Sequence, residues 1–309
     1  MTRREIRRPI AIGVTVLLIA AGCAGGVSRE ETTAAIAQLG ADDMAALVPV
    51  SREATDAVTD ACASGQPGDV EAAADQVAVA QTRWHETEAW WMGPATDLRA
   101  NALVDWPVNT DDVDELLAAA EPVTIDADYL AEFVGADTRG YGAAAYLLDG
   151  APLDDRACDY ATAATVLAAS TIDEVASAWT ESTDAASDQE QLTATGGLDA
   201  VVNHLLTLLS SRESAHLGAR SASIERVLFG ADGDSGLAVM VDDDLAARLR
   251  VEADRMVAVA GPVEQPSVEQ QSAGFEEAAE ALRATVATEV VAKLGIKVTF
   301  SDADGDSAG

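Results

Sequence analysis

Apolar residues recur three and four positions apart over most of this sequence. This spacing places them on one side of an α-helix, which makes one turn every 3.6 residues. Alanine, a strong helix former, is abundant throughout. The pattern predicts long amphipathic helices over residues 69–91, 156–181, 198–217, 237–260 and 268–294.

Short segments rich in Gly, Pro and Asp separate the predicted helices, and only 297–300 reads as an extended segment. An all-α fold is therefore expected. A chain of this length can form two helical bundles. We expect two helical-bundle halves packed together, with an N-terminal half over 23–150 and a C-terminal half over 151–309. The connection between Gly150 and Asp155 is the predicted boundary.

The first 22 residues have the pattern of an export signal. Four arginines precede an apolar run of 13 residues over 10–22, which is too short to span a bilayer as a helix. The segment Ala20-Ala21-Gly22-Cys23 resembles a bacterial lipobox, in which the Cys thiol carries a lipid. We therefore expect residues 1–22 to be a signal peptide and Cys23 to be the lipidation site. Simple cleavage without a lipid is the alternative, and both the general secretory and the twin-arginine routes stay open.

The charge of the chain narrows the range of partners. The formal net charge is −34, and removal of residues 1–22, with four arginines and one glutamate, leaves −37. Such a surface repels phosphate backbones and anionic lipid headgroups. We expect no nucleic-acid partner, and membrane contact only through the N-terminal lipid. The protein should lie on the outer face of the cytoplasmic membrane or in the periplasm.

Two cysteines remain once Cys23 is assigned to the lipid. An exported protein meets an oxidising compartment, so Cys62 and Cys158 are predicted to form a disulfide. The alternative is a pair of buried free thiols.

Four segments resemble the imelysin-like proteins, an exported bacterial group that includes iron-regulated lipoproteins. They are, in order, "TEAWWMGPATDLRANALVDWPVN" at 87–109, "RGYGAAAYLLDG" at 139–150, "RSASIERVLFG" at 220–230 and "VATEVVAKLGIKVTFSDADGD" at 286–306. The resemblance implies two related helical-bundle halves, a link to iron uptake and an envelope metal-uptake protein as partner.

The chain departs from the family at its metal motif. The family's second segment carries Gly-x-His-x-x-Glu, a helical His and Glu suited to a divalent metal. Here Gly140 is kept, but Gly142 and Ala145 stand at the His and Glu positions. This loss favours a non-enzymatic protein. We expect Gly142→His with Ala145→Glu to restore metal affinity.

Another His-x-x-Glu pair is available at His85 and Glu88, where helical spacing puts both side chains on one side. Glu88 coincides with a recurring family glutamate, and the pair could bind iron or zinc. The alternative is that His85 is a surface or interface histidine. His204 and His216 are expected to be packing and helix-end residues, and the tryptophans near 84–106 to pack where the halves meet.

Other site chemistry is scarce. The sequence has no Ser-His-Asp arrangement, P-loop or dinucleotide fingerprint, and the aspartates at 302–306 do not complete an EF-hand. The leading hypothesis is an exported, lipid-anchored, non-enzymatic protein that binds a ligand or partner in envelope iron or metal acquisition. The alternatives are a divalent-metal-binding protein or metallopeptidase with a non-standard site around Glu88, and a structural lipoprotein without a ligand.

Overall fold

The computed structural model describes residues 29–119, 124–149, 153–184, 197–211, 215–233, 235–261 and 268–299. Within these ranges the regular structure is helical, and one isolated antiparallel bridge joins Asp105 to Gly140. The predicted all-α fold class is confirmed. The signal segment, Cys23 and the aspartates at 302–306 lie outside the described residues.

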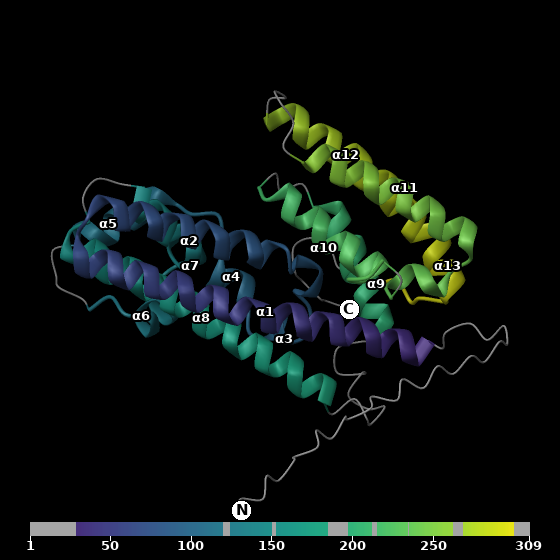
Figure 1. Ribbon diagram of the computed structural model, residues 1–309, viewed down its shortest axis with the longest axis horizontal. Helices are drawn as coiled ribbons and strands as arrows, with labels where there is room; N and C mark the ends of the chain where they lie inside the picture. The colour runs from purple at the N-terminus through teal and green to yellow at the C-terminus, as the bar shows by residue number, and fades with distance from the viewer. Residues whose placement is uncertain are drawn as a thin grey trace, which may run out of the picture.

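One group of helices is built around two long neighbours, α1 and α8, which run side by side (Figure 1). The second helix, α2, packs against α1 and α7. The members of this group are α1 (Arg29–Ser64), α2 (Pro67–His85), α3 (Pro94–Asp97), α4 (Ala100–Val104), α5 (Thr110–Ala118), α6 (Ala127–Phe133), α7 (Gly140–Asp149) and α8 (Asp155–Asp184). Along α1 the buried residues follow the helical period, as in Met44, Leu47, Ser51, Ala54 and Val58.

The second group of helices lies at one end of the first (Figure 1). It consists of α9 (Gly197–Ser210), α10 (Leu217–Phe229), α11 (Asp243–Ala260), α12 (Val268–Thr285) and α13 (Val291–Leu294), with a π-helical segment at Val286–Val290 between the last two. Helix α10 packs against α11 and also against the end of α2, so it connects the two groups.

Helix packing divides the chain at a different place from the expected boundary. We expected a new half to begin at residue 151, but α8, which follows that point, packs along α1 and α7. The change of packing group falls between α8 and α9. The Gly- and Pro-containing sequence at 149–155 therefore separates two helices of the same packing group, α7 and α8, because Gly and Pro end a helix inside a unit as well as between units.

Tryptophans fill the centre of the N-terminal group. Trp84, Trp90 and Trp179 are fully buried, and the rings of Trp90 and Trp179 meet edge to face with centroids 6.3 Å apart. Gly40 on α1 packs closely against both rings, since a Cβ atom there would lie 3.1 Å from each of them. Trp106 differs from the expected packing role, because it follows the end of α4 and is 43% exposed.

Cys62 on α1 and Cys158 on α8 form a disulfide, with Cα atoms 5.5 Å apart. The link joins positions 96 residues apart in the sequence. Among the described residues, no helix combines the length and the apolar character needed to cross a membrane.

Candidate functional site

The site begins where α2 ends. The predicted helix over 69–91 stops at His85, and a short 3-10 turn follows at Glu88–Trp90. This turn directs both His85 and Glu88 inward, with exposures of 4% and 1%. Nδ1 of His85 lies 2.5 Å from Oε1 of Glu88. His85 is therefore not a surface histidine, because the helix ends early enough to turn it into the protein; the other part of that alternative, an interface histidine, agrees with its contact to His216 of the second group of helices.

Asp105 contacts the other nitrogen of the same imidazole. Its Oδ2 lies 2.7 Å from Nε2 of His85, and Gln81 on α2 donates to both carboxylate oxygens at 3.0 and 3.1 Å. Asp105 follows α4, and the backbone bridge to Gly140 at the start of α7 fixes its position. His85 thus lies between two buried carboxylates.

The C-terminal group of helices holds Glu88 from the opposite side. Arg220 on α10 is 1% exposed and donates from Nε to Oε2 of Glu88 at 2.5 Å. His204 on α9 contacts the carbonyl oxygen of Glu88 through Nε2 at 2.8 Å. The hydroxyl of Ser223 accepts a hydrogen bond from the backbone N–H of Ala89 at 2.7 Å. The turn after α2 is therefore fixed by both groups of helices.

These contacts set the charges of the cluster. Burial alone would lower the pKa of His85, but hydrogen bonds to Asp105 and Glu88 and their negative charges raise it to about 9. Burial would raise the pKa of Glu88, but the hydrogen bonds and charges of His85 and Arg220 lower it. Burial lowers the pKa of His204. At neutral pH the cluster therefore contains a charged His85 and a neutral His204.

His216 completes a group of metal-ligating side chains. It precedes α10 in the left-handed backbone region, with φ of 54°, which a residue with a Cβ rarely adopts. Its ring stacks on that of His85, with centroids 3.9 Å apart and planes 8° apart. One donor atom each from His85, Asp105 and His216 lie within 4.8 Å of one another. Together with His204, the site brings together all three histidines of the chain.

This group can hold a metal after small movements. Donor atoms around a tetrahedral zinc ion lie roughly 3.3 Å apart, since each bond is close to 2 Å. The 2.7 Å contact between His85 and Asp105 must therefore open slightly, and the proton between them must leave. The stacked rings must also turn, because a metal lies in the plane of the imidazole that binds it. His216 is the one member of this group that is only half-buried.

Comparisons with known proteins now give the family. The model of the imelysin family, peptidase family M75, matches residues 41–220, which is more than half of the chain. This chain belongs to the imelysin family. It is similar in structure to an iron-regulated protein A precursor from Parabacteroides distasonis, with a TM-score of 0.73, 14% identity, and coverage of 87% of this chain and 96% of that one. It is also similar to an imelysin-like protein from Psychrobacter arcticum, with a TM-score of 0.70, 16% identity, and coverage of 90% and 100%. No curated protein matches the sequence.

Gly142, which stands at the histidine position of the imelysin motif, lies next to this site. A Cβ atom placed on Gly142 would lie 2.9 Å from the carbonyl oxygen of Trp106, 3.4 Å from Val108 and 3.5 Å from Oδ1 of Asp105. The segment that carries Asp105 therefore occupies the space that a histidine at 142 would need. Our expectation that Gly142→His and Ala145→Glu would simply restore metal affinity is not supported by this packing.

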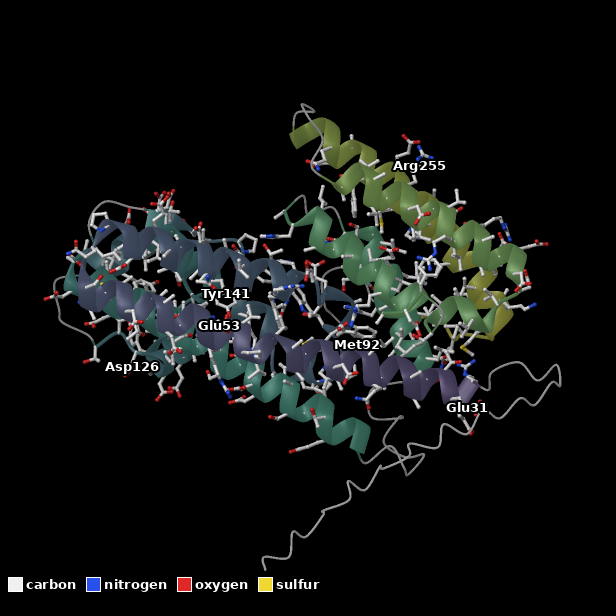
Figure 2. The ribbon with its side chains drawn as sticks, in the orientation of Figure 1. Glu31, Glu53, Met92, Asp126, Tyr141 and Arg255 are labelled. Carbon is white, nitrogen blue, oxygen red and sulfur yellow. A yellow bond between two sulfur atoms is a disulfide. The ribbon has the colours of Figure 1, made fainter. Side chains whose placement is uncertain are left out.

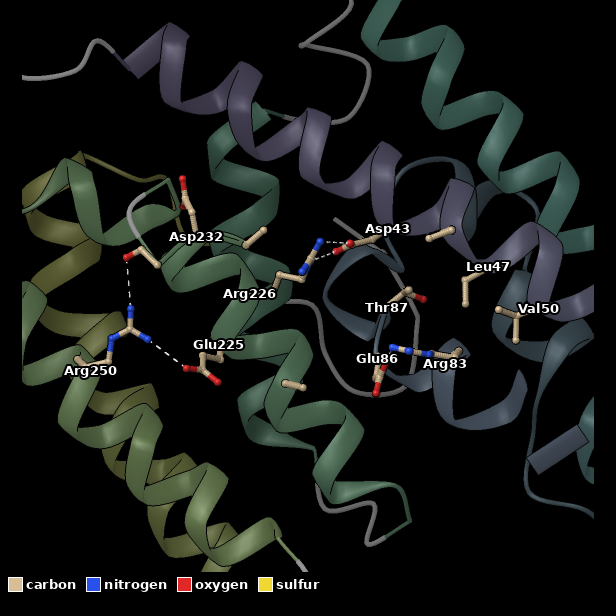
Figure 3. Close-up of a pocket in the computed structure, with 15 residues that line it drawn as sticks. Asp43, Leu47, Val50, Arg83, Glu86, Thr87, Glu225, Arg226, Asp232 and Arg250 are labelled. Atoms are coloured by element: carbon tan, nitrogen blue, oxygen red, sulfur yellow. Dashed lines mark hydrogen bonds and ion pairs between the residues drawn. The ribbon is translucent and has the colours of Figure 1, made fainter. Parts of the chain in front are cut away.

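A separate cleft is lined in part by the same turn (Figure 3). It has a volume of about 740 Å³, and Glu86 and Thr87 contribute to its lining. The other lining residues come from both groups of helices: Asp43, Ala46, Leu47, Val50, Arg83, Ala222, Glu225, Arg226, Gly230, Ala231, Asp232, Gly233 and Arg250.

The three arginines of this cleft are each paired with a carboxylate. Arg226 contacts Asp43 at 2.5 Å, Arg83 contacts Glu86 at 2.5 Å, and Arg250 contacts Glu225 at 3.0 Å. Burial raises the pKa of Asp43 despite the hydrogen bonds from Arg226 and Trp90. With Asp232 the lining has four acidic residues and three arginines, and each arginine contacts one of the carboxylates, so the cleft has no excess of positive charge for an anionic ligand. The histidine cluster is the stronger candidate site.

Two members of the site were predicted from the sequence, and the others were missed. His85 and Glu88 were proposed together, and the structure brings them together. Asp105, His216 and Arg220 were not proposed. Asp105 lies in the first family-like segment and Arg220 opens the third, so a buried acid and a buried arginine in matching segments were available as signals. His216 had no such signal, because its backbone conformation is visible only in the structure.

Proposed function

We propose that this member of the imelysin family is a metal-binding protein of the cell envelope that takes part in metal acquisition. The observation that carries the proposal is the group of His85, Asp105 and His216, whose donor atoms lie within 4.8 Å of one another. The chain has only three histidines, and two of them contribute to this group. The presence of two of the three histidines in one group supports the proposal that this group binds a metal ion.

The donor set favours iron(II) or zinc(II). Two imidazoles and one carboxylate are typical ligands of both metals in proteins, and they leave at least one coordination position open. A structurally similar protein is named as iron-regulated, which agrees with iron as the cargo. When bound, the metal supplies a positive charge that replaces the proton of His85.

The remaining residues of the cluster position the ligands. Glu88 accepts from Nδ1 of His85 and leaves Nε2 for the metal, the arrangement in which a carboxylate orients a metal-binding histidine. Arg220 and His204 hold Glu88 in turn. Our sequence-based choice of Glu88 as a ligand thus becomes an orienting role in this proposal.

Binding fits the site better than peptidase chemistry. A general base works best with a pKa near the working pH. The pKa of Glu88 is instead lowered, since His85 and Arg220 stabilise its charged form against the effect of burial. Glu88 would therefore be a weak base. The second carboxylate, Asp105, is engaged by Gln81 and His85.

The proposed function includes a location of the protein in the cell envelope. The signal-like segment over 1–22 and the lipobox-like Cys23 support export and a lipid anchor on the outer face of the cytoplasmic membrane or in the periplasm. An envelope metal-uptake protein is the proposed partner, which would receive or deliver the metal.

Metal content tests the function. The mature protein, freed of metal with a chelator, would be equilibrated with zinc(II) or anaerobic iron(II), dialysed and analysed by elemental mass spectrometry. We expect one equivalent of metal per chain. A Glu277→Gln variant is the control, since it removes an exposed carboxylate of α12 that is no part of the cluster, and it should keep the metal. Metal-free native protein after this treatment would contradict the proposal.

A further inference from the structure

Tyr141 has a buried hydroxyl group that no described residue satisfies. The side chain is fully buried, and the oxygen makes no hydrogen bond within the part of the chain that the structure describes. A buried polar group without a partner destabilises a protein by about 1–3 kcal/mol. Such a group therefore needs an explanation, and a bound species that the protein alone does not supply is one.

The backbone on both sides of Tyr141 approaches the segment that carries Asp105, and the charge of Asp105 acts on the Tyr141 hydroxyl. The residue before it, Gly140, forms the backbone bridge with Asp105. The residue after it, Gly142, approaches the same carboxylate so closely that a Cβ there would be 3.5 Å from Oδ1. Figure 2 shows Tyr141 among the helices of the N-terminal group.

The hydroxyl is a hydrogen-bond donor under all ordinary conditions. Burial raises the pKa of Tyr141, and the negative charge of Asp105 raises it further. The phenol therefore keeps its proton and can donate it to an oxygen or nitrogen acceptor. Asp105 does not serve as this acceptor, since the contacts of its carboxylate come from Gln81 and His85.

We propose that Tyr141 is a binding residue of the metal site and that its hydroxyl donates a hydrogen bond to a small oxygen ligand that shares the metal. The inference rests on the proposed function. Three protein ligands leave a coordination position open, and water or a small carboxylate anion fits such a position. We assign the ligand to this class because the Tyr141 hydroxyl offers it a hydrogen-bond donor.

Tyr160 provides a matched control. It is also a fully buried tyrosine, but its hydroxyl already donates to the carbonyl oxygen of Thr138 at 2.5 Å. The variants Tyr141→Phe and Tyr160→Phe each remove one buried hydroxyl from the same group of helices. They differ in whether a protein partner loses its hydrogen bond.

The experiment has two measurements on the native protein and both variants. Thermal unfolding of the metal-free proteins should show Tyr141→Phe as stable as native or more stable, and Tyr160→Phe less stable. Titration of the cobalt(II)-loaded proteins with acetate, followed by visible absorption, should show roughly tenfold weaker anion binding for Tyr141→Phe. Tyr160→Phe should bind acetate as the native protein does.

The possible outcomes distinguish a failure of the proposed role of Tyr141 from a failure of the proposed metal binding. A native protein that takes up no cobalt(II), zinc(II) or iron(II) would overturn both. Cobalt(II) uptake with equal acetate affinity in native and Tyr141→Phe proteins would overturn the role of Tyr141 alone. A loss of metal-free stability in Tyr141→Phe as large as in Tyr160→Phe would also overturn it, because the hydroxyl would then already have a partner.

Discussion

His85 lies in a buried cluster whose charges balance. It and Arg220 carry positive charges, and Glu88 and Asp105 carry negative ones, with side-chain contacts of 2.5 to 2.7 Å between them. Removing one partner of such a buried group leaves an uncompensated charge, which is far more costly than loss of a surface ion pair. Metal binding at His85 replaces one positive charge by another and so keeps part of this balance.

The raised pKa of His85 predicts how the metal-free protein responds to pH. A histidine whose pKa rises from 6.5 when unfolded to about 9 when folded stabilises the protein fully below pH 6.5. This contribution, on the order of 3 kcal/mol, should decline as the pH rises from 6.5 and be lost above about 9. Urea unfolding of chelator-treated protein between pH 6 and 9.5 measures it.

The variant His85→Gln separates the contribution of His85 from that of other titrating groups in this experiment. His85→Gln keeps a polar side chain but does not titrate, so its unfolding free energy should approach that of the native protein as the pH rises. An equal gap between the two proteins at pH 6 and pH 9.5 would show that the charge of His85 does not stabilise the fold.

At the residue scale, only part of the site could be predicted from the sequence. His85 and Glu88 could be paired because three positions along a chain fix proximity in a helical turn. Asp105 is 20 residues from His85, and Arg220 is 132 residues from Glu88. Contacts over such distances depend on the packing of helices, which no local spacing encodes.

At the scale of a single element, the start of α7 positions Asp105 in the site. Gly140 and Gly142 lie against the chain segment at 104–108, and this close approach brings Asp105 to His85. The family resemblance implies only that Gly140 is the retained glycine of the motif and that Gly142 replaces its histidine. The structure gives Gly142 a packing role of its own, since backbone atoms occupy the space beside its Cα.

Gly142→Ala should therefore destabilise the protein, although alanine favours helices. Its Cβ would meet the carbonyl oxygen of Trp106 at 2.9 Å, and the segment at 105–108 would have to shift. We expect a loss of about 1–3 kcal/mol of unfolding free energy, as for other overpacked positions. The control is Gly68→Ala on α2, where a Cβ meets nothing within 4 Å and stability should be kept or raised. Equal stability of the two variants would argue against this role for Gly142.

Helix positions were easier to predict than helix ends. The apolar period correctly indicated α8, α9, α11 and α12, because each packs one side against neighbours. The predicted helix at 69–91 instead ends at His85. The functional turn therefore lies inside a segment whose pattern continues as if it were helical, because residues 88–90 remain buried after the helix stops.

At the scale of the molecule, the site is shared between the two groups of helices. His85 and Asp105 come from the N-terminal group, and His216, His204 and Arg220 come from the C-terminal group. The all-α class followed from the sequence, since helical periodicity is a local signal. The division after α8 did not, because α8 joins α1 through packing over long sequence distances.

The lipid anchor is a prediction about the whole molecule. Replacing Cys23 with Ser removes the thiol that the lipid would modify, and with it the only proposed attachment to the membrane. We expect the variant to leave the membrane fraction and partition into the aqueous phase of a detergent separation. A variant that partitions with detergent as the native protein does would contradict lipidation at Cys23.

The central claim is that His85, Asp105 and His216 hold a metal, and a variant of His216 tests it without harming the fold. His216 has a positive φ, a conformation that glycine adopts without strain. His216→Gly should therefore fold with a thermal stability close to native, while one of three ligands is lost. Arg99→Gly is the matched control, because Arg99 is the other described non-glycine residue with positive φ, at 52°.

The decisive measurement is calorimetric titration of zinc(II) into chelator-treated native, His216→Gly and Arg99→Gly proteins. We predict one site per chain in the native and Arg99→Gly proteins, with equal affinity, and at least about 100-fold weaker binding in His216→Gly. Equal affinity in all three proteins would place any metal site elsewhere, and absence of binding to native protein would contradict the claim outright.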